Sequence, residues 1–210
     1  MNKQFFAALG LAAAALAPAH AALITAPSGL GLPTSLLDFE TFDGLLTTGP
    51  VAVGSGVTFT GDAGSEVGAN NRDLGANGMW GANGYFVAAA GIGELRFSFA
   101  ELTAGAGAFV NNFAIGELPL NLVVSVYGDN NQIIETFSYV VSTDPFGYNE
   151  GQFLGITRAN ADIRSISFKG LGVVVDNLQF TAAVPEPQTY ALLLAGLTAV
   201  GFVARRRRQG

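Results

Sequence analysis

The chain of 210 residues contains no cysteine, so its fold is held together without disulfide bonds. The single histidine, His20, lies at the end of an apolar N-terminal segment. The rest of the chain therefore cannot perform Ser-His-Asp or Cys-His catalysis, and it cannot bind zinc or haem through histidine. An enzyme built from the remaining residues would need paired carboxylates, as in glycoside hydrolysis, or a serine working with Lys169. Neither arrangement has a local signature in the sequence.

Positive charge is scarce between the two ends of the chain. Residues 22–183 contain five Lys and Arg against fifteen Asp and Glu, a net charge near −10 that is more acidic than the −6 of the whole sequence. Such a surface repels phosphate backbones, so we expect no nucleic-acid partner. The same charge is compatible with solubility in an extracellular matrix and with the binding of divalent cations.

Helical periodicity is also missing from this central part, and Gly and Asn interrupt it often. Apolar, β-rich runs on both sides of residues 128–131 predict a hairpin over 120–141, and a second hairpin is expected over 163–180. Residues 93–100 and 107–116 add two candidate strands. Short strands with Gly-rich turns and no crossover helices predict one all-β domain over 22–183, an antiparallel β-sandwich or jelly roll.

The stretch "GANNRDLGANGMWGANGYF" (68–86) repeats Gly-Ala-Asn three times at irregular spacing. Gly and Asn tolerate left-handed turns, so we expect a long loop here. Trp80 and Tyr85 lie in this stretch. They form either an aromatic plug over one end of the core or a platform that stacks on sugar rings and binds a glycan.

The N-terminus has the features of a secretory signal peptide. Lys3 precedes an apolar run over residues 5–17, and Ala19 and Ala21 frame an A-x-A cleavage site. We expect removal of residues 1–21, so that the mature chain begins at Ala22. The protein is therefore expected to be exported.

The C-terminus contains an uncharged apolar segment, residues 189–204, followed by Arg205, Arg206, Arg207 and Arg208. As a helix it would span roughly 24 Å, which is short for a hydrocarbon core of about 30 Å. By the positive-inside rule the arginines stay cytoplasmic and everything before residue 189 lies outside. On spacing alone, an ordinary permanent anchor and a transient one both remain open.

The triplet Pro185, Glu186 and Pro187 stands directly before this segment. Triplet, short apolar helix and terminal arginine cluster together resemble the PEP-CTERM sorting signal of Gram-negative bacteria. The resemblance implies that residues 184–210 form a sorting signal, with a transmembrane helix over 189–204 and a basic tail over 205–208. It also implies that the helix holds the protein transiently in the inner membrane. An exosortase then cuts near the triplet and passes the body to the cell surface or extracellular matrix.

Two carboxylate motifs are candidates for a metal site. In "LLDFETF" (36–42), Asp38 and Glu40 should share one face, while Leu37 and Phe39 share the other. In "VVVDNLQF" (173–180), Asp176 is expected on the same face as Val174, Leu178 and Phe180. A carboxylate on a core-facing surface needs a partner or an ion. Calcium takes oxygen ligands and suits a chain without cysteine and with its one histidine in the signal peptide.

These two motifs resemble the calcium-stabilised jelly rolls of carbohydrate-binding modules, whose first and last strands pair and share a structural ion. The resemblance implies Ca²⁺ ligands at Asp38, Glu40 and Asp176. The alternative is that the three side chains are strand-end carboxylates facing water.

Two functions follow from this sequence. The first is a non-catalytic, exported protein of the envelope or matrix, associated with exopolysaccharide in a biofilm. The alternative is an extracellular carbohydrate-active enzyme that uses two carboxylates. Its candidates are Asp38, Glu40, Asp73, Glu94, Asp144, Glu150 and Asp176.

Overall fold

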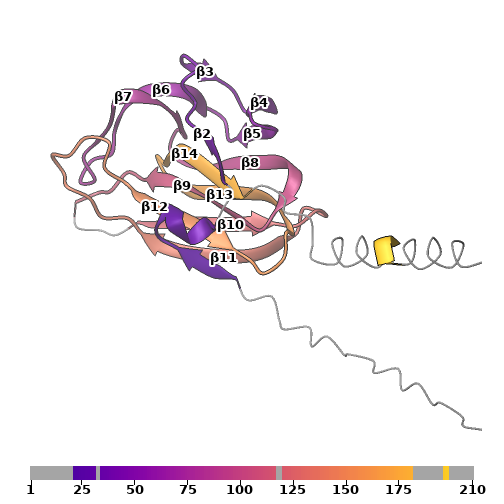
Figure 1. Ribbon diagram of the computed structural model, residues 1–210. Coiled ribbons are helices and arrows are strands. Elements are labelled where there is room, and N and C mark those ends of the chain that lie inside the picture. Colours follow the sequence, from indigo (N-terminus) through magenta and orange to yellow (C-terminus); the bar gives the residue numbers. More distant parts are fainter. Residues whose placement is uncertain (1–20, 32–33, 117–119, 182–195, 199–210) are drawn as a thin grey trace, which may run out of the picture.

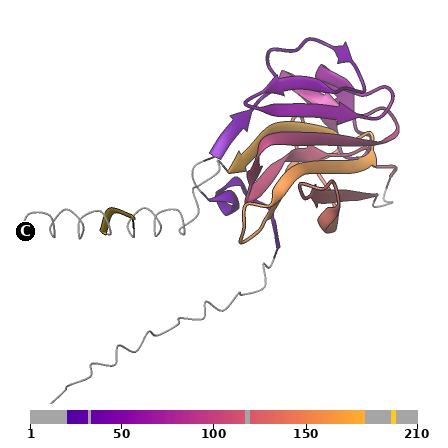
Figure 2. The ribbon, with the colours of Figure 1, turned by 90° about the vertical axis from the view of Figure 1, so that its right-hand side faces the viewer.

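Two antiparallel β-sheets pack face to face in the computed structural model, which describes residues 21–31, 34–116, 120–181 and 196–198 (Figures 1 and 2). The strands are β1 (Ala22–Ile24), β2 (Thr34–Leu37), β3 (Leu45–Leu46), β4 (Val51–Gly54), β5 (Val57–Gly61), β6 (Glu66–Asp73), β7 (Met79–Ala88), β8 (Ile92–Thr103), β9 (Gly105–Asn111), β10 (Asn121–Tyr127), β11 (Ile133–Val140), β12 (Gln152–Thr157), β13 (Ile163–Leu171) and β14 (Val174–Thr181), with a 3₁₀ helix η1 (Pro27–Leu30) after β1. The larger sheet has eight strands in the order β1-β12-β9-β14-β7-β6-β3, with β2 also paired to β14. The other sheet has six strands in the order β11-β10-β13-β8-β5-β4. The predicted antiparallel β-sandwich is confirmed.

The core lies between the sheets and is rich in phenylalanine. On β8, Leu95, Phe97 and Phe99 alternate inward, as the sequence predicts, and all three are buried. The ring of Phe97 lies 5.7 Å from that of Phe39 and 5.5 Å from that of Phe59, measured between ring centroids. Tilted aromatic pairs of this kind stabilise beyond the area they bury. Phe59 and Phe97 lie on paired strands of one sheet, while Phe39 follows β2 of the other sheet, so the ring of Phe97 also connects the two sheets.

The hairpin predicted over 120–141 is confirmed, because β10 pairs with β11 across a turn in which Asn131 has a positive φ of 63°. The hairpin predicted over 163–180 is wrong. Although β13 and β14 are consecutive, β13 lies in the six-stranded sheet and β14 in the eight-stranded one. Gly172, with φ 53°, turns the chain between the sheets, and its N–H donates to the carbonyl of Gly91 rather than to β13. Consecutive strands that alternate between two sheets are typical of a jelly roll.

The stretch 68–86 is not the expected loop, since most of it forms the hairpin β6–β7. The pairing contains two register shifts, one between Val67 and Ala69 and one between Ala69 and Asn71. Glycine makes these bulges possible: Gly81 has φ 132°, and a Cβ there would overlap the carbonyl oxygen of Asn70. The glycines therefore shape two strands that bulge, a pattern that resembles a loop in sequence.

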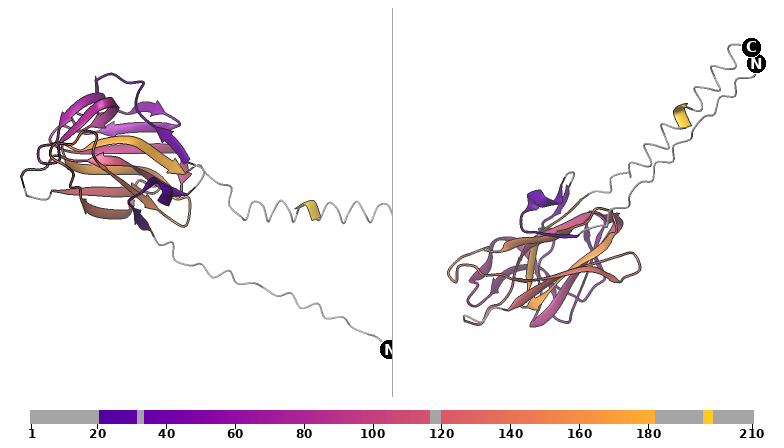
Figure 3. Two further views of the ribbon diagram at one scale, coloured as in Figure 1. Left: turned by 60° about the vertical axis from the view of Figure 1, so that its left-hand side comes forward. Right: turned by 90° about the horizontal axis from the view of Figure 1, so that it is seen from below.

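The predicted signal peptide and sorting tail lie almost entirely outside the described residues. Strand β1, drawn in indigo, occupies one edge of the larger sheet (Figure 3). Of the helix predicted over 189–204, only residues 196–198 are described, and they are helical and exposed. Within the described ranges no helix combines the length and apolarity needed to cross a membrane.

Candidate functional site

Strand β14 changes its partner half-way along one edge. Its first residues, Val174 and Val175, pair with Ala88 and Val87 of β7. From Leu178 onward the strand pairs with β2 instead. Between the two partners the register along β9 is broken, and Asn177 adopts a positive φ of 51°. The break leaves Asp176 and Asn177 without a strand partner on that edge among the described pairings.

This break lies beside the segment that carries two of the three predicted metal ligands. Leu37, the last residue of β2, lies opposite Leu178, so the residues that follow β2 lie next to the bulge. The negative charges of Glu40 and Asp38 both act on Asp176 and raise its pKa. We call Asp38, Glu40 and Asp176 the carboxylate cluster. Asp38 and Glu40 are exposed while Leu37 and Phe39 are buried, which confirms the predicted alternation even though β2 ends before them.

Glu40 replaces the missing strand partner of β7. Continued without the bulge, the pairing of β14 with β7 would set Tyr85 opposite Asn177. Instead, the N–H of Tyr85 donates to Oε1 of Glu40 at 2.9 Å. Gly84, with φ 133°, allows this approach, because a Cβ at that position would overlap the same carboxylate oxygen. Glu40 therefore already has a structural role in joining β7 to the segment after β2.

Asp176 is the member of the cluster whose ionised form is destabilised. Burial raises its pKa to about 7, against a bond from the N–H of Asn177 that favours the ionised form, and the charges of Glu40 and Asp38 raise it further. Asn177 donates twice to this carboxylate, from its N–H to Oδ1 at 2.6 Å and from Nδ2 to Oδ2 at 3.2 Å. Either a proton or a bound cation would neutralise the charge of this carboxylate.

The cluster is not a preassembled metal site. Among the described residues, no three Asp, Glu, His or Cys side chains are arranged so that they could hold one ion. The donor chemistry nevertheless suits calcium, because all the side chains offer oxygen. For Glu40 to ligate an ion through Oε1, that oxygen would have to be shared with or released from the N–H of Tyr85.

The face predicted for Asp176 needs correction. Leu178 lies in the main core between the sheets, whereas Val174 packs in a smaller cluster with Trp80 and Phe86. The two residues point to opposite sides because the bulge at 176–179 reverses the alternation of side chains. Asp176 lies at the point of reversal, where it is half-buried and outside the main core.

Trp80 is the centre of that smaller cluster and has no ring face open to a sugar. Its side chain is only 4% exposed, and the ring of Phe86 contacts it edge-on with centroids 6.2 Å apart. The platform interpretation fails for Trp80, and the aromatic plug describes it. Tyr85 is half-exposed on β7, where its N–H is bound to Glu40.

The exposed aromatics lie on a loop that sequence reasoning passed over. Phe146 is 89% exposed and Tyr148 is 59% exposed, both between β11 and β12. The loop is held in place: the N–H of Met79 donates to the carbonyl of Gly147 at 3.0 Å, and the N–H of Phe146 donates to Oδ1 of Asp144 at 2.9 Å. The run "DPFGY" (144–148), with aromatics among turn residues and no apolar alternation, was the available signal.

The comparison with known families concerns the C-terminus. Residues 183–208 match the PEP-CTERM protein-sorting motif, and the match includes Pro185, Glu186, Pro187 and the four arginines. The chain carries a PEP-CTERM sorting signal. The predicted resemblance is confirmed, and a protein with this signal is exported and processed by an exosortase. No curated protein matches the sequence of the chain.

Solved structures of carbohydrate-binding modules are similar to the chain at a low level. A family 11 module of the cellulosomal cellulase Lic26A-Cel5E of Clostridium thermocellum is 14% identical, with a TM-score of 0.35, over 75% of this chain and 99% of the module. A family 35 module from Clostridium thermocellum is 12% identical, with a TM-score of 0.37, over 72% of this chain and 100% of the module. At this level of likeness no ligand and no site is transferred from them.

Proposed function

We propose that the protein is a non-catalytic component of the cell surface or extracellular matrix, delivered by its PEP-CTERM signal and associated there with exopolysaccharide. The observation that carries the proposal is the match of residues 183–208 to the sorting motif. Export agrees with the signal peptide predicted over 1–21. In this proposal the protein is anchored transiently in the inner membrane, and the exosortase binds it transiently.

One pair of acids that line a hollow of the described surface has a structural role. The hollow beside β10 is lined by Asp129 and Asp162, two carboxylates of the kind a glycosidase needs. Each of them is engaged by an arginine. Oδ1 of Asp129 lies 2.6 Å from Nη2 of Arg164, and Asp162 binds Arg158 through two bonds of 2.7 and 2.9 Å. These bidentate and short contacts stabilise the loop ends.

Intact-mass analysis of the protein recovered from the native host tests the sorting proposal. We expect a mature chain that begins at Ala22 and ends near Pro187, because the A-x-A site and the sorting motif mark both cuts. The measurement is made separately on the inner-membrane and matrix fractions. A matrix protein that still carries Arg205 to Arg208 would contradict the proposal, as would recovery from the inner membrane alone.

One observation favours the alternative of a carbohydrate-active enzyme. Asp176, with a pKa of about 7 beside Glu40, resembles a pair of carboxylates in which one is kept protonated to act as general acid. The test is release of reducing ends from polysaccharides by the mature protein, compared with Asp176→Asn. We expect no release from either. Hydrolysis by the wild type that disappears in Asp176→Asn would establish the enzyme.

We also propose that calcium is the cation that neutralises the carboxylate cluster in the matrix. Asp38 and Glu40 are exposed and Asp176 is half-buried, and the charges of Glu40 and Asp38 act on Asp176. A body with a net charge near −10 attracts divalent cations to such a point.

A further inference from the structure

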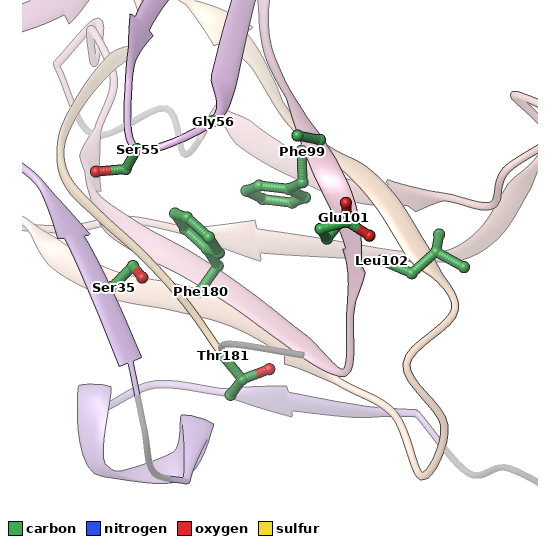
Figure 4. Close-up of a pocket in the computed structure, with 9 residues that line it drawn as sticks. Ser35, Ser55, Gly56, Phe99, Glu101, Leu102, Phe180 and Thr181 are labelled. Carbon is green, nitrogen blue, oxygen red and sulfur yellow. The ribbon is translucent and has the colours of Figure 1, made fainter. Parts of the chain in front are cut away.

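A pocket of about 280 Å³ opens at one end of the sandwich (Figure 4). One wall comes from the paired ends of β2 and β14, with Ser35 and Phe180 directly opposite each other in the register. The other wall comes from the β4–β5 turn at Ser55 and from the end of β8 at Phe99 and Glu101. The pocket therefore joins the two sheets and lies apart from the carboxylate cluster, whose residues do not line it.

The floor of the pocket is aromatic. The rings of Phe99 and Phe180 lie 4.8 Å apart between centroids and are tilted by 35°. Phe99 is almost completely buried, whereas Phe180 is only partly buried and offers ring surface to the pocket. Figure 4 shows the two rings facing each other, with the polar side chains around them. An apolar floor of this kind suits a flat ligand with C–H groups on its face.

The rim of the pocket carries polar groups with bonding capacity to spare. The hydroxyls of Ser35 and Ser55 and the carboxylate of Glu101 make no side-chain hydrogen bond or ion pair with any residue that the structure describes. Ser55 is held in place by a two-residue turn in which it and Gly56 have φ of 51° and 72°, the type I′ geometry of tight hairpins. A hydroxyl both donates and accepts, and a carboxylate accepts. The rim can therefore bind several hydroxyl groups at once.

We propose that this pocket binds one uncharged sugar ring of a glycan chain, with the ring over Phe180 and its hydroxyls on Glu101, Ser35 and Ser55. The proposal rests on the exopolysaccharide association proposed above and names the site and the ligand class for it. The pocket volume of about 280 Å³ lies just below the range for drug-sized ligands, about 300 to 1,000 Å³, which fits a single ring. No Lys or Arg lines the pocket and Glu101 is an anion, so an acidic sugar is disfavoured.

Saturation-transfer NMR on the mature protein, with the methyl glycosides of glucose, galactose and mannose and with N-acetylglucosamine as probes, tests the pocket. We expect millimolar binding of at least one of these sugars. Glu101→Gln should weaken it about 3- to 10-fold, because the lost charged acceptor is replaced by a weaker one. Phe180→Leu should weaken it further. Phe146→Leu, which removes an equally aromatic but distant and exposed ring, should leave it unchanged.

Glu101 is exposed, so Glu101→Gln reports on binding even if Phe180→Leu loses stability. The inference would be overturned if none of the four sugars showed saturation transfer from the wild type, or if the wild type and Glu101→Gln bound them equally. Co-sedimentation with exopolysaccharide from the host separates the two levels. A wild type that does not co-sediment removes the proposed association itself. Co-sedimentation that is equal in wild type and both pocket variants overturns only the pocket.

Discussion

In a chelating buffer the free energy of unfolding should decrease as the pH rises from 3.8 to about 7, because of Asp176. The unfolded chain releases this proton near 3.8, while the folded domain holds it until about 7. Stability from the protonated group is therefore complete below 3.8 and is lost as the pH rises through 7. At 1.36 kcal/mol per pKa unit the loss is at most about 4 kcal/mol. A domain of this size would melt about ten degrees lower.

Asp176→Asn is expected to remove this dependence and to make the domain more stable than the wild type at alkaline pH. Asparagine keeps the shape of the side chain and carries no charge, so it corresponds to the protonated form at every pH. Thermal unfolding across the pH range measures the effect. Asp43→Asn is the matched control, because it removes an exposed carboxylate from the same segment as Glu40. If the melting temperatures of the wild type and Asp176→Asn change with pH in the same way, the pKa of Asp176 is not raised in the folded domain.

Calcium should act on the same group, and only where the proton is absent. Above pH 7 the ionised cluster can bind calcium, and folding gains about 2.7 kcal/mol when the ion is at 100 times its Kd. Below pH 5 the proton already neutralises Asp176, so calcium should have little effect there. Equal melting temperatures with calcium and with chelator at alkaline pH would contradict a calcium site. A calcium shift that survives Asp176→Asn would place the ion elsewhere.

Replacing Arg205, Arg206, Arg207 and Arg208 together by serine should abolish retention and processing of the precursor. Each arginine resists crossing the bilayer by a few kcal/mol, so the cluster holds the tail on the cytoplasmic side. Without it the precursor should pass through the membrane with its tail uncut. Mass analysis of the exported protein measures the result. Replacement by four lysines keeps the positive charge and is expected to preserve processing, whereas processing of the serine variant at the wild-type rate would show that charge is not part of the signal.

The sequence was sufficient for strands in which apolar residues alternate cleanly. β8 was predicted because apolar residues alternate along it, and every second residue from Leu95 to Phe99 is buried. The β10–β11 hairpin was predicted because two β-rich runs lie on either side of turn residues that tolerate a positive φ. The stretch 68–86 was not, because bulges at glycine break the alternation that marks a strand. The change of sheet between β13 and β14 was missed for another reason. A short glycine connection looks the same in sequence whether it joins two strands of one sheet or of two.

The assignment of metal ligands in the candidate site stays a prediction, and the geometry of the site was not predicted. Asp38, Glu40 and Asp176 were grouped through the resemblance to carbohydrate-binding modules, in which the first and last strands pair. In the structure β14 pairs with β2, the second strand, and Asp38 and Glu40 follow it. Their surroundings depend on the bulge at Asn177, which no pattern of apolar residues announces. The pocket at Phe180 could not be predicted, because it combines the ends of strands from both sheets with a turn.

The end of β14, the last described strand before the sorting motif, is firmly bonded within the sandwich. The strand lies inside the larger sheet, bonded to β9 on one edge and to β2 on the other, and its last residue is tied by the hydroxyl of Thr103, which donates to the carbonyl of Thr181 at 2.6 Å. Four residues separate Thr181 from the far side of Pro185, a reach of at most about 14 Å. The Pro-Glu-Pro triplet of the sorting motif therefore begins within this reach of the end of β14. Any pull on the tail loads two ladders of hydrogen bonds in shear, so the sandwich resists being drawn apart while its tail is engaged.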